Sequence, residues 1–143
     1  MVKYFLSHGA KVDHTDSLGN TALTWAVLKG NINLISLLLK SGADINQQNR
    51  RDGMTPLLDA VEYSPASVSF LLKHGADINA QNKQGITPLM IASANNNYLL
   101  VKFFVQHGAN VNLMDKNHQS ALFFADKNAN ITIIDYLKSI GGR

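Results

Sequence analysis

Apolar residues recur along the chain at the three- and four-residue spacing of one helix face. The most apolar segments of this kind lie at residues 32–39, 68–72 and 100–105. Each is preceded by a shorter segment with a leucine and an alanine three residues apart, such as Leu57 and Ala60. Thr55 can cap that segment, and Pro56 then takes the first helical position, where its missing N–H group costs nothing. The pattern predicts pairs of short helices.

The helix pairs repeat with a fixed period. Gly-Ala pairs begin at Gly9, Gly42, Gly75 and Gly108, which lie 33 residues apart, and Gly141 continues the series. Each of these glycines stands where an apolar segment ends, and it can close the helix in the left-handed conformation that other residues rarely adopt. A second landmark, a Thr or Ser followed by Pro or Ala and then Leu, recurs at nearly the same spacing. Two landmarks in phase indicate a repeat protein.

The repeats divide the chain into a partial repeat at residues 1–15, with only a second helix at residues 2–8, and repeats at residues 16–48, 49–81, 82–114 and 115–143. No repeat can bury its apolar stripe alone, so we expect a single domain in which the repeats stack as an all-α solenoid. The first helices carry small side chains and the second helices carry bulky ones, which predicts a curved stack with the first helices on its concave side. Polar and apolar residues alternate at residues 44–46, 77–79 and 110–112, which predicts an extended arm there.

Several segments carry a resemblance to a known family. Residues 37–46 read LLLKSGADIN, residues 71–79 read LLKHGADIN, and residues 103–112 read FFVQHGANVN. The tripeptide TPL stands at residues 55–57 and 87–89. These phased copies resemble ankyrin repeats over nearly the whole chain. The resemblance implies stacked helix–turn–helix units with β-hairpin loops and an L-shaped cross-section, and it implies protein binding.

The chain departs from the ankyrin pattern at several positions. Four residues replace the family's histidine after the TPL tripeptide: Thr24, Leu58, Met90 and Phe123. His118 stands where the other repeats have glycine, which predicts a less regular last loop tip. Three residues match the loop asparagine that some animal hydroxylases modify, namely Asn46, Asn79 and Asn112.

Composition narrows the class of protein. Of the 143 residues, 45% are hydrophobic and 16% are charged, which excludes an intrinsically disordered chain. The absence of cysteine excludes disulfides, thiolate metal sites and thiol nucleophiles. No apolar stretch approaches the ~20 residues of a membrane-spanning helix, and residues 1–13 lack a signal-peptide core. We therefore expect no membrane insertion and an intracellular protein, cytoplasmic or nuclear, with a secreted effector left open.

No catalytic or cofactor motif is present, so the sequence predicts a protein that is not an enzyme and holds no cofactor. His8, His74 and His107 precede phased glycines, but equivalent residues of stacked repeats lie roughly 10 Å apart, too far to share one metal ion. The net charge of +3 is mild, and Arg50-Arg51 is the one compact basic pair, so we expect no nucleic-acid partner.

The first helices carry a candidate partner-binding strip. One position in each lies two residues after the core leucine, ~200° around the helix, and so points away from the core face. Its occupants are Trp25, Asp59, Ile91 and Phe124. The next helical turn adds Leu28, Lys29, Glu62, Tyr63 and Asn95. Trp25, Tyr63 and Phe124 are the candidate anchors, since interface hot spots favour Trp and Tyr. The alternative is that some of these residues pack against loops of their own stack.

A second candidate surface lies at the loop tips. Its apolar residues share one phased position, at Leu18, Met54 and Ile86. If exposed, they form an apolar line suited to recognition. The alternative is that this position is half-buried between neighbouring tips.

Together these patterns predict a protein–protein interaction module that presents a concave groove and its loop tips to a partner protein. The alternative is a scaffold or targeting arm of a larger enzyme or secreted effector, with the catalytic part outside this chain. The helix at residues 2–8 has no partner helix, which favours a fragment of a longer array. Self-association through uncapped ends is left open.

Overall fold

The computed structural model describes residue 4 and residues 7–143. In this part of the chain it contains α-helices and one 3-10 helix and no β-strand, so the predicted all-α class is confirmed. The helix predicted at residues 2–8 lies largely outside the described residues. The chain forms two compact units, unit 1 (Met1–Ala76) and unit 2 (Asp77–Arg143).

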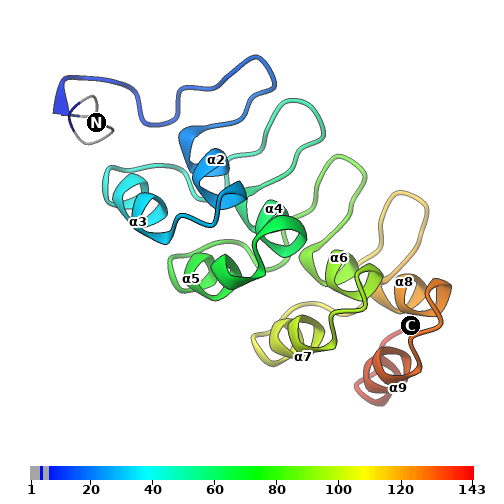
Figure 1. The fold of residues 1–143 in the computed structure, drawn as a ribbon. Helices are drawn as coiled ribbons and strands as arrows, with labels where there is room; N and C mark the ends of the chain where they lie inside the picture. The colour runs from blue at the N-terminus through cyan, green and yellow to red at the C-terminus, as the bar shows by residue number, and fades with distance from the viewer. Residues whose placement is uncertain (1–3, 5–6) are drawn as a thin grey trace. The chain divides into compact units, whose positions relative to one another are not determined.

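Unit 1 is built from helix pairs. In the first pair, α2 (Ala22–Leu28) packs against α3 (Ile32–Lys40). In the second pair, α4 (Pro56–Tyr63) packs against the 3-10 helix η1 (Pro65–Ser67) and α5 (Val68–Lys73). The first helices of the two pairs, α2 and α4, lie side by side (Figure 1).

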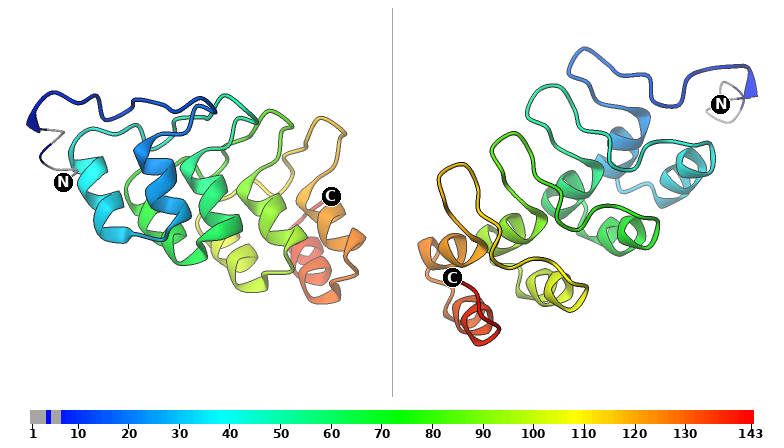
Figure 2. Two further views of the ribbon diagram at one scale, coloured as in Figure 1. Left: turned by 45° about the horizontal axis from the view of Figure 1, so that its top comes forward. Right: turned by 180° about the vertical axis from the view of Figure 1, so that it is seen from behind.

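Unit 2 has the same construction. Helix α6 (Pro88–Ala94) packs against α7 (Tyr98–Gln106), and α8 (Ala121–Lys127) packs against α9 (Ile131–Ser139). Helices α6 and α8 lie side by side, and α7 also contacts α9 (Figure 2).

Side-chain caps begin most of the helices. The hydroxyls of Thr21, Thr55 and Thr87 accept hydrogen bonds from backbone amides of the first turns of α2, α4 and α6, as the sequence predicts for Thr55. Asparagines cap three second helices, a feature that the sequence analysis did not identify. They are Asn31 in α3, Asn97 in α7 and Asn130 in α9.

The core of each unit lies where its helices meet. Leu23, Leu57 and Leu89 are buried, as the helical spacing predicts. The alanines three residues after this leucine position in α2, α4, α6 and α8 are also buried, and their small size lets neighbouring first helices approach closely. They are Ala26, Ala60, Ala92 and Ala125.

The extended arms predicted at residues 44–46, 77–79 and 110–112 are wrong. Ile45 and Asn46 form a turn, because Asp44 Oδ1 accepts a hydrogen bond from the Asn46 amide at 2.9 Å. The same turn recurs at Asp77, with a distance of 2.9 Å, and at Asn110, with a distance of 3.0 Å. A side chain that bonds the backbone two residues ahead competes with extended pairing, which alternation of polarity alone does not reveal.

Each loop tip is organised by one Asp or Asn side chain. Asp16 Oδ1 accepts from the amides of Leu18 and Asn20, both at 2.9 Å. The equivalent residues at intervals of 33 positions also accept two loop amides each. Asn82 and Asp115 accept from the residues two and four ahead, and Asn49 accepts from the residues three and four ahead. Side chains rather than strands thus set the shape of these tips.

The last tip is as regular as the first, so the irregularity predicted from His118 is wrong. His118 adopts φ 60°, the left-handed conformation that glycine adopts in the other repeats. The Asp115 amide donates to the Gln119 carbonyl at 3.0 Å, as the Asp16 amide does to the Asn20 carbonyl at 3.0 Å. The side-chain bonds of Asp115 hold the turn even though the residue at its left-handed position is not glycine.

Hydrogen bonds also join neighbouring loops within each unit. The Arg50 amide donates to the Leu18 carbonyl at 3.0 Å, and the Lys116 amide donates to the Gln84 carbonyl at 2.9 Å. Gly85 lies at this junction with φ +82°, and a Cβ added there would lie 2.9 Å from Asp115 Cα. The close approach of the two loops therefore requires glycine.

We predict that Gly85→Ala lowers the free energy of unfolding more than Gly108→Ala does. Both positions have left-handed φ angles, +82° and +88°, so each variant loses about 1–2 kcal/mol from backbone strain. Only at Gly85 does the added Cβ also meet the backbone of the next loop, since nothing lies within 4 Å at Gly108. Urea titration followed by circular dichroism measures both losses. Equal losses would contradict the close approach.

Candidate functional site

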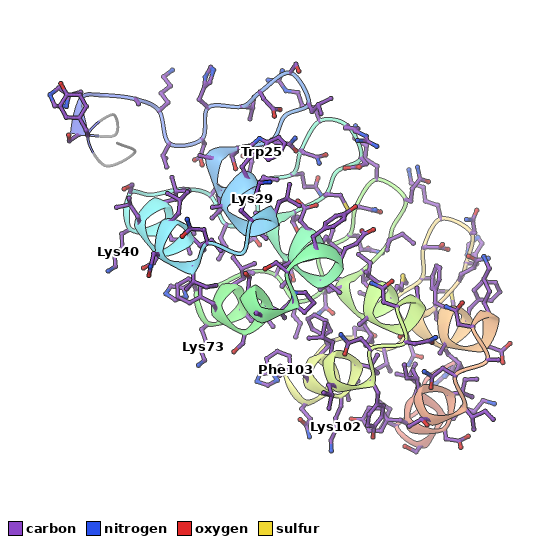
Figure 3. The ribbon with its side chains drawn as sticks, in the orientation of Figure 1. Trp25, Lys29, Lys40, Lys73, Lys102 and Phe103 are labelled. Carbon is purple, nitrogen blue, oxygen red and sulfur yellow. The ribbon has the colours of Figure 1, made fainter. Side chains whose placement is uncertain are left out.

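The first helices of unit 1 carry the unit 1 strip, which comprises Trp25, Leu28, Lys29, Asp59, Glu62 and Tyr63. Trp25 is 47% exposed and Tyr63 is 61% exposed. Lys29 and Glu62 are also exposed, and Leu28 is half-buried. Figure 3 labels Trp25, on α2, and Lys29, the residue that directly follows α2. The strip thus presents two large aromatic rings from neighbouring helices.

Trp25 is held by the loop of its own repeat. Its indole N–H donates to Asp16 Oδ2 at 3.1 Å. Hydrogen bonds from the Asn20 backbone and from Trp25 hold the pKa of Asp16 below its ordinary value. Trp25 therefore fits both partner binding and packing against its own stack, because the loop holds its ring while about half of the residue stays exposed.

Asp59 differs from the prediction of an exposed residue. It occupies the strip position of α4 but is only 7% exposed. Its Oδ2 atom is closed off from solvent and has no hydrogen-bond partner. The helical spacing gives the correct direction, since the neighbouring strip residues Glu62 and Tyr63 are exposed, but it does not reveal what lies over that position.

The electrostatic surroundings of Asp59 are unfavourable to its charge. Burial, together with the negative charges of Asp52 and Glu62, raises the pKa of Asp59 from 3.8 to about 7. The pKa of Tyr63 is also raised, chiefly by Glu62 and in smaller part by Asp59. The carboxyl groups of this face therefore lie close enough to act on one another.

The unit 2 strip comprises Ile91, Asn95 and Phe124. Asn95 is exposed, whereas Ile91 and Phe124 are half-buried. Phe124 packs edge-on against Phe123, with ring centroids 5.9 Å apart. The unit 2 strip is therefore less open than the unit 1 strip.

The loop-tip residues divide between the two interpretations. Leu18 is exposed, while Met54 and Ile86 are half-buried. The apolar position is therefore open in the first loop and partly covered in the next two.

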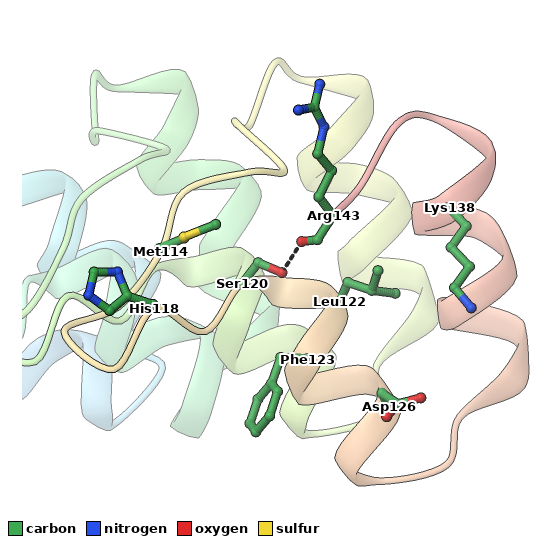
Figure 4. Close-up of a pocket in the computed structure, with 8 residues that line it drawn as sticks. All are labelled: Met114, His118, Ser120, Leu122, Phe123, Asp126, Lys138 and Arg143. Carbon is green, nitrogen blue, oxygen red and sulfur yellow. Dashed lines mark hydrogen bonds between the residues drawn. The ribbon is translucent and has the colours of Figure 1, made fainter.

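A hollow lies against α8 in unit 2. Its volume is about 310 Å³. The residues that line it are Met114, His118, Ser120, Leu122, Phe123, Asp126, Lys138 and Arg143 (Figure 4). Phe123 is 42% exposed, but Met90, which is the equivalent residue of α6, is 1% exposed. The hollow thus lies on a face that is covered in the preceding repeat.

The phased histidines have local structural roles. Nδ1 of His8, His74 and His107 lies 2.7–2.8 Å from the carbonyl oxygen four residues earlier. Each ring stacks on the aromatic ring at that earlier position, with centroids 4.0–4.1 Å apart. Among the described residues, no group of three or more His, Asp or Glu side chains could hold a metal ion.

The phased asparagines connect neighbouring repeats. Asn46 Nδ2 donates to the Gly75 carbonyl at 3.3 Å, and Asn112 Nδ2 donates to the Gly141 carbonyl at 3.2 Å. Asn79 Oδ1 accepts from the Asn110 amide at 2.8 Å. All three side chains thus take part in the stacking of repeats.

No helix in the described residues has the length and apolar character needed to cross a membrane.

Phased helix pairs, capped by threonine and closed by glycine, define this chain as a helical repeat protein. Its sequence matches the family of ankyrin repeats (3 copies) at residues 1–82 and 62–142. The chain belongs to the ankyrin-repeat family, whose members generally act as protein-interaction modules.

Segments of three curated proteins are similar to parts of this chain. Palmitoyltransferase ZDHHC17 of Danio rerio is 58% identical over 38 residues, which are 27% of this chain and 6% of that protein. The Homo sapiens palmitoyltransferase ZDHHC17 is 63% identical over 30 residues, 21% of this chain and 5% of that protein. Alpha-latrotoxin-Lg1a of Latrodectus geometricus is 38% identical over 56 residues, 39% of this chain and 4% of that protein. The matched segments thus span a small fraction of each relative.

We predict that the stability of the chain falls between pH 4 and pH 7 because of Asp59. Its pKa in the folded chain is raised from 3.8 to about 7, so the folded state holds a proton that the unfolded state releases. The contribution is fully present below about pH 4 and is lost as the pH rises through about 7, with an upper limit of about 4 kcal/mol. Asp59→Asn removes this loss.

Urea titrations across that pH range measure the effect. The exposed Asp135 provides the control, because in Asp135→Asn the free energy of unfolding is expected to depend on pH as it does in the wild type. If the free energy of unfolding depends on pH equally in Asp59→Asn and the wild type, Asp59 is not the cause of that dependence.

Proposed function

We propose that this chain binds a protein partner through the unit 1 strip. The observation that carries the proposal is the pair of exposed aromatic residues, Trp25 and Tyr63, on helices that pack side by side. Trp and Tyr dominate the binding energy of many interfaces. The hydrogen bond from Trp25 to Asp16 fixes the indole before binding, which reduces the entropy lost on association.

Each unit carries further candidate contact residues. Leu18 adds an exposed apolar residue at a loop tip of unit 1, and Met54 adds a half-buried one. In unit 2, Asn95 contributes a polar contact, and Ile86, Ile91 and Phe124 contribute partly covered apolar ones. The chain works by rigid presentation and not by catalysis. It takes no cofactor and no nucleic acid, and it acts inside the cell.

We predict that Trp25→Ala/Tyr63→Ala weakens capture of partner proteins by at least about tenfold, since hot-spot side chains contribute 2 kcal/mol or more. The measurement is a quantitative affinity capture from cell extract, with the wild type and the variant immobilised at equal density. Circular dichroism establishes that both are folded, which is expected because both side chains are exposed.

The control is Leu99→Ala/Ile131→Ala, which removes exposed apolar side chains from the second helices α7 and α9. This variant keeps the wild-type captures. If the aromatic double variant captures the same proteins as well as the wild type does, the unit 1 strip is not the binding surface.

A second function, as the targeting arm of a larger enzyme or secreted effector, is favoured by the likeness to segments of a palmitoyltransferase and of a toxin. Under this proposal the native polypeptide is larger than 15.6 kDa. An immunoblot of the source cells, with an antibody raised against this chain, measures that mass. A single band at 15.6 kDa would exclude the larger polypeptide.

A further inference from the structure

The unit 1 strip contains a carboxyl group with no partner. This group belongs to Asp59, which is in phase with Trp25 on α2 and one helical turn before Tyr63 on α4. The residue keeps 7% exposure, so it lies directly beneath the surface, and its Oδ2 makes no hydrogen bond. A buried carboxyl oxygen without a partner is costly, and such groups are normally satisfied.

The negative charges around Asp59 favour binding of a cation. Asp52 in the preceding loop and Glu62 on the same helix both act on it as negative charges. Arg51, at the same loop tip, pairs with Asp52 at 3.9 Å. Lys29 is exposed at the end of the neighbouring helix, and no ion pair within 4.0 Å joins it to Asp59 or Glu62 in the described part of the chain.

The aromatic rings of Trp25 and Tyr63 also favour a positively charged side chain. Residues four apart on a helix face one another, so Tyr63 lies beside Asp59. Trp25 occupies the equivalent position on the adjacent helix, roughly 8–10 Å away. A lysine or arginine side chain can lay its apolar stem along aromatic rings while its charged end interacts with their faces and with a carboxylate.

Building on the proposed partner binding, we infer that the unit 1 strip recognises a protein segment through one lysine or arginine side chain, which pairs with Asp59 and lies against Trp25 and Tyr63. The torsion of an aspartate carboxyl about its Cβ–Cγ bond is soft, so a small rotation turns an oxygen toward the incoming cation. The pairing satisfies the orphaned oxygen and relieves the repulsion from Asp52 and Glu62.

Peptide pools test this recognition. The probes are labelled nonapeptides of random sequence with a fixed central lysine, arginine, norleucine or glutamate, applied to the immobilised full chain. We expect the lysine and arginine pools to bind at least about tenfold more tightly than the norleucine pool, because a charge-assisted hydrogen bond has about that effect. Asp59→Asn removes most of this preference, and Asp135→Asn leaves it unchanged.

Lys29 supplies an independent readout. Lys29→Gln removes a competing positive charge from the edge of the strip, so it strengthens binding of the lysine pool about twofold. If the partner segment were acidic, the same variant would weaken binding and the glutamate pool would be preferred, which would overturn the inference. Circular dichroism checks that each variant is folded, and the exposed Glu62→Gln, which lowers the lysine preference about twofold, tests the charge if Asp59→Asn does not fold.

The outcomes separate this inference from the proposed function. If Trp25→Ala/Tyr63→Ala leaves capture intact, the strip itself is not the binding surface. If that double variant loses capture but Asp59→Asn keeps both capture and pool preference, only the recognition of a basic residue is wrong.

Discussion

The packing of one repeat against the next is the constraint on which this protein depends. The helices run for six to nine residues, too short to be stable alone in water, and they gain stability by burying an apolar face against a neighbour. The equivalent residues Met90 and Phe123 show the effect. Met90 lies on α6, which packs against α8, and is buried, whereas Phe123 lies on α8, the first helix of the last pair, and is exposed. The exposure of a side chain thus depends on its neighbour as much as on its own helix.

The loops obey a second constraint, which is met by polar side chains. Asp16 and its phased equivalents each accept hydrogen bonds from two amides of their own tip, so side chains rather than strands set the shape of each tip. That shape brings Asp16 to the indole of Trp25 and Asp52 close enough to act on Asp59. The chemistry of the strip is therefore set by the loops beside it as well as by the helices that carry it.

The sequence predicts what depends on local periodicity. The helix pairs, the buried alanines and the glycine closures follow from spacing and capping, which act within a few residues. The expectations at residues 44–46 and at His118 are wrong because side chains there bond to the backbone. The Asp and Asn residues that recur at intervals of 33 are the sequence signal for these bonds. The burial of Asp59 could not be predicted, because it depends on which groups of other segments lie over one position of α4.

The amide bridges between repeats have an evolutionary consequence. Asn46 and Asn112 each donate to a glycine carbonyl 29 residues ahead, so the repeats at residues 16–48 and 82–114 each carry the donor for a bond to the repeat that follows. Duplicating a cassette of two neighbouring repeats, such as residues 16–81, copies this bond with both of its partners. Such a gene can lengthen or shorten by whole cassettes, while selection alters the side chains of one face independently.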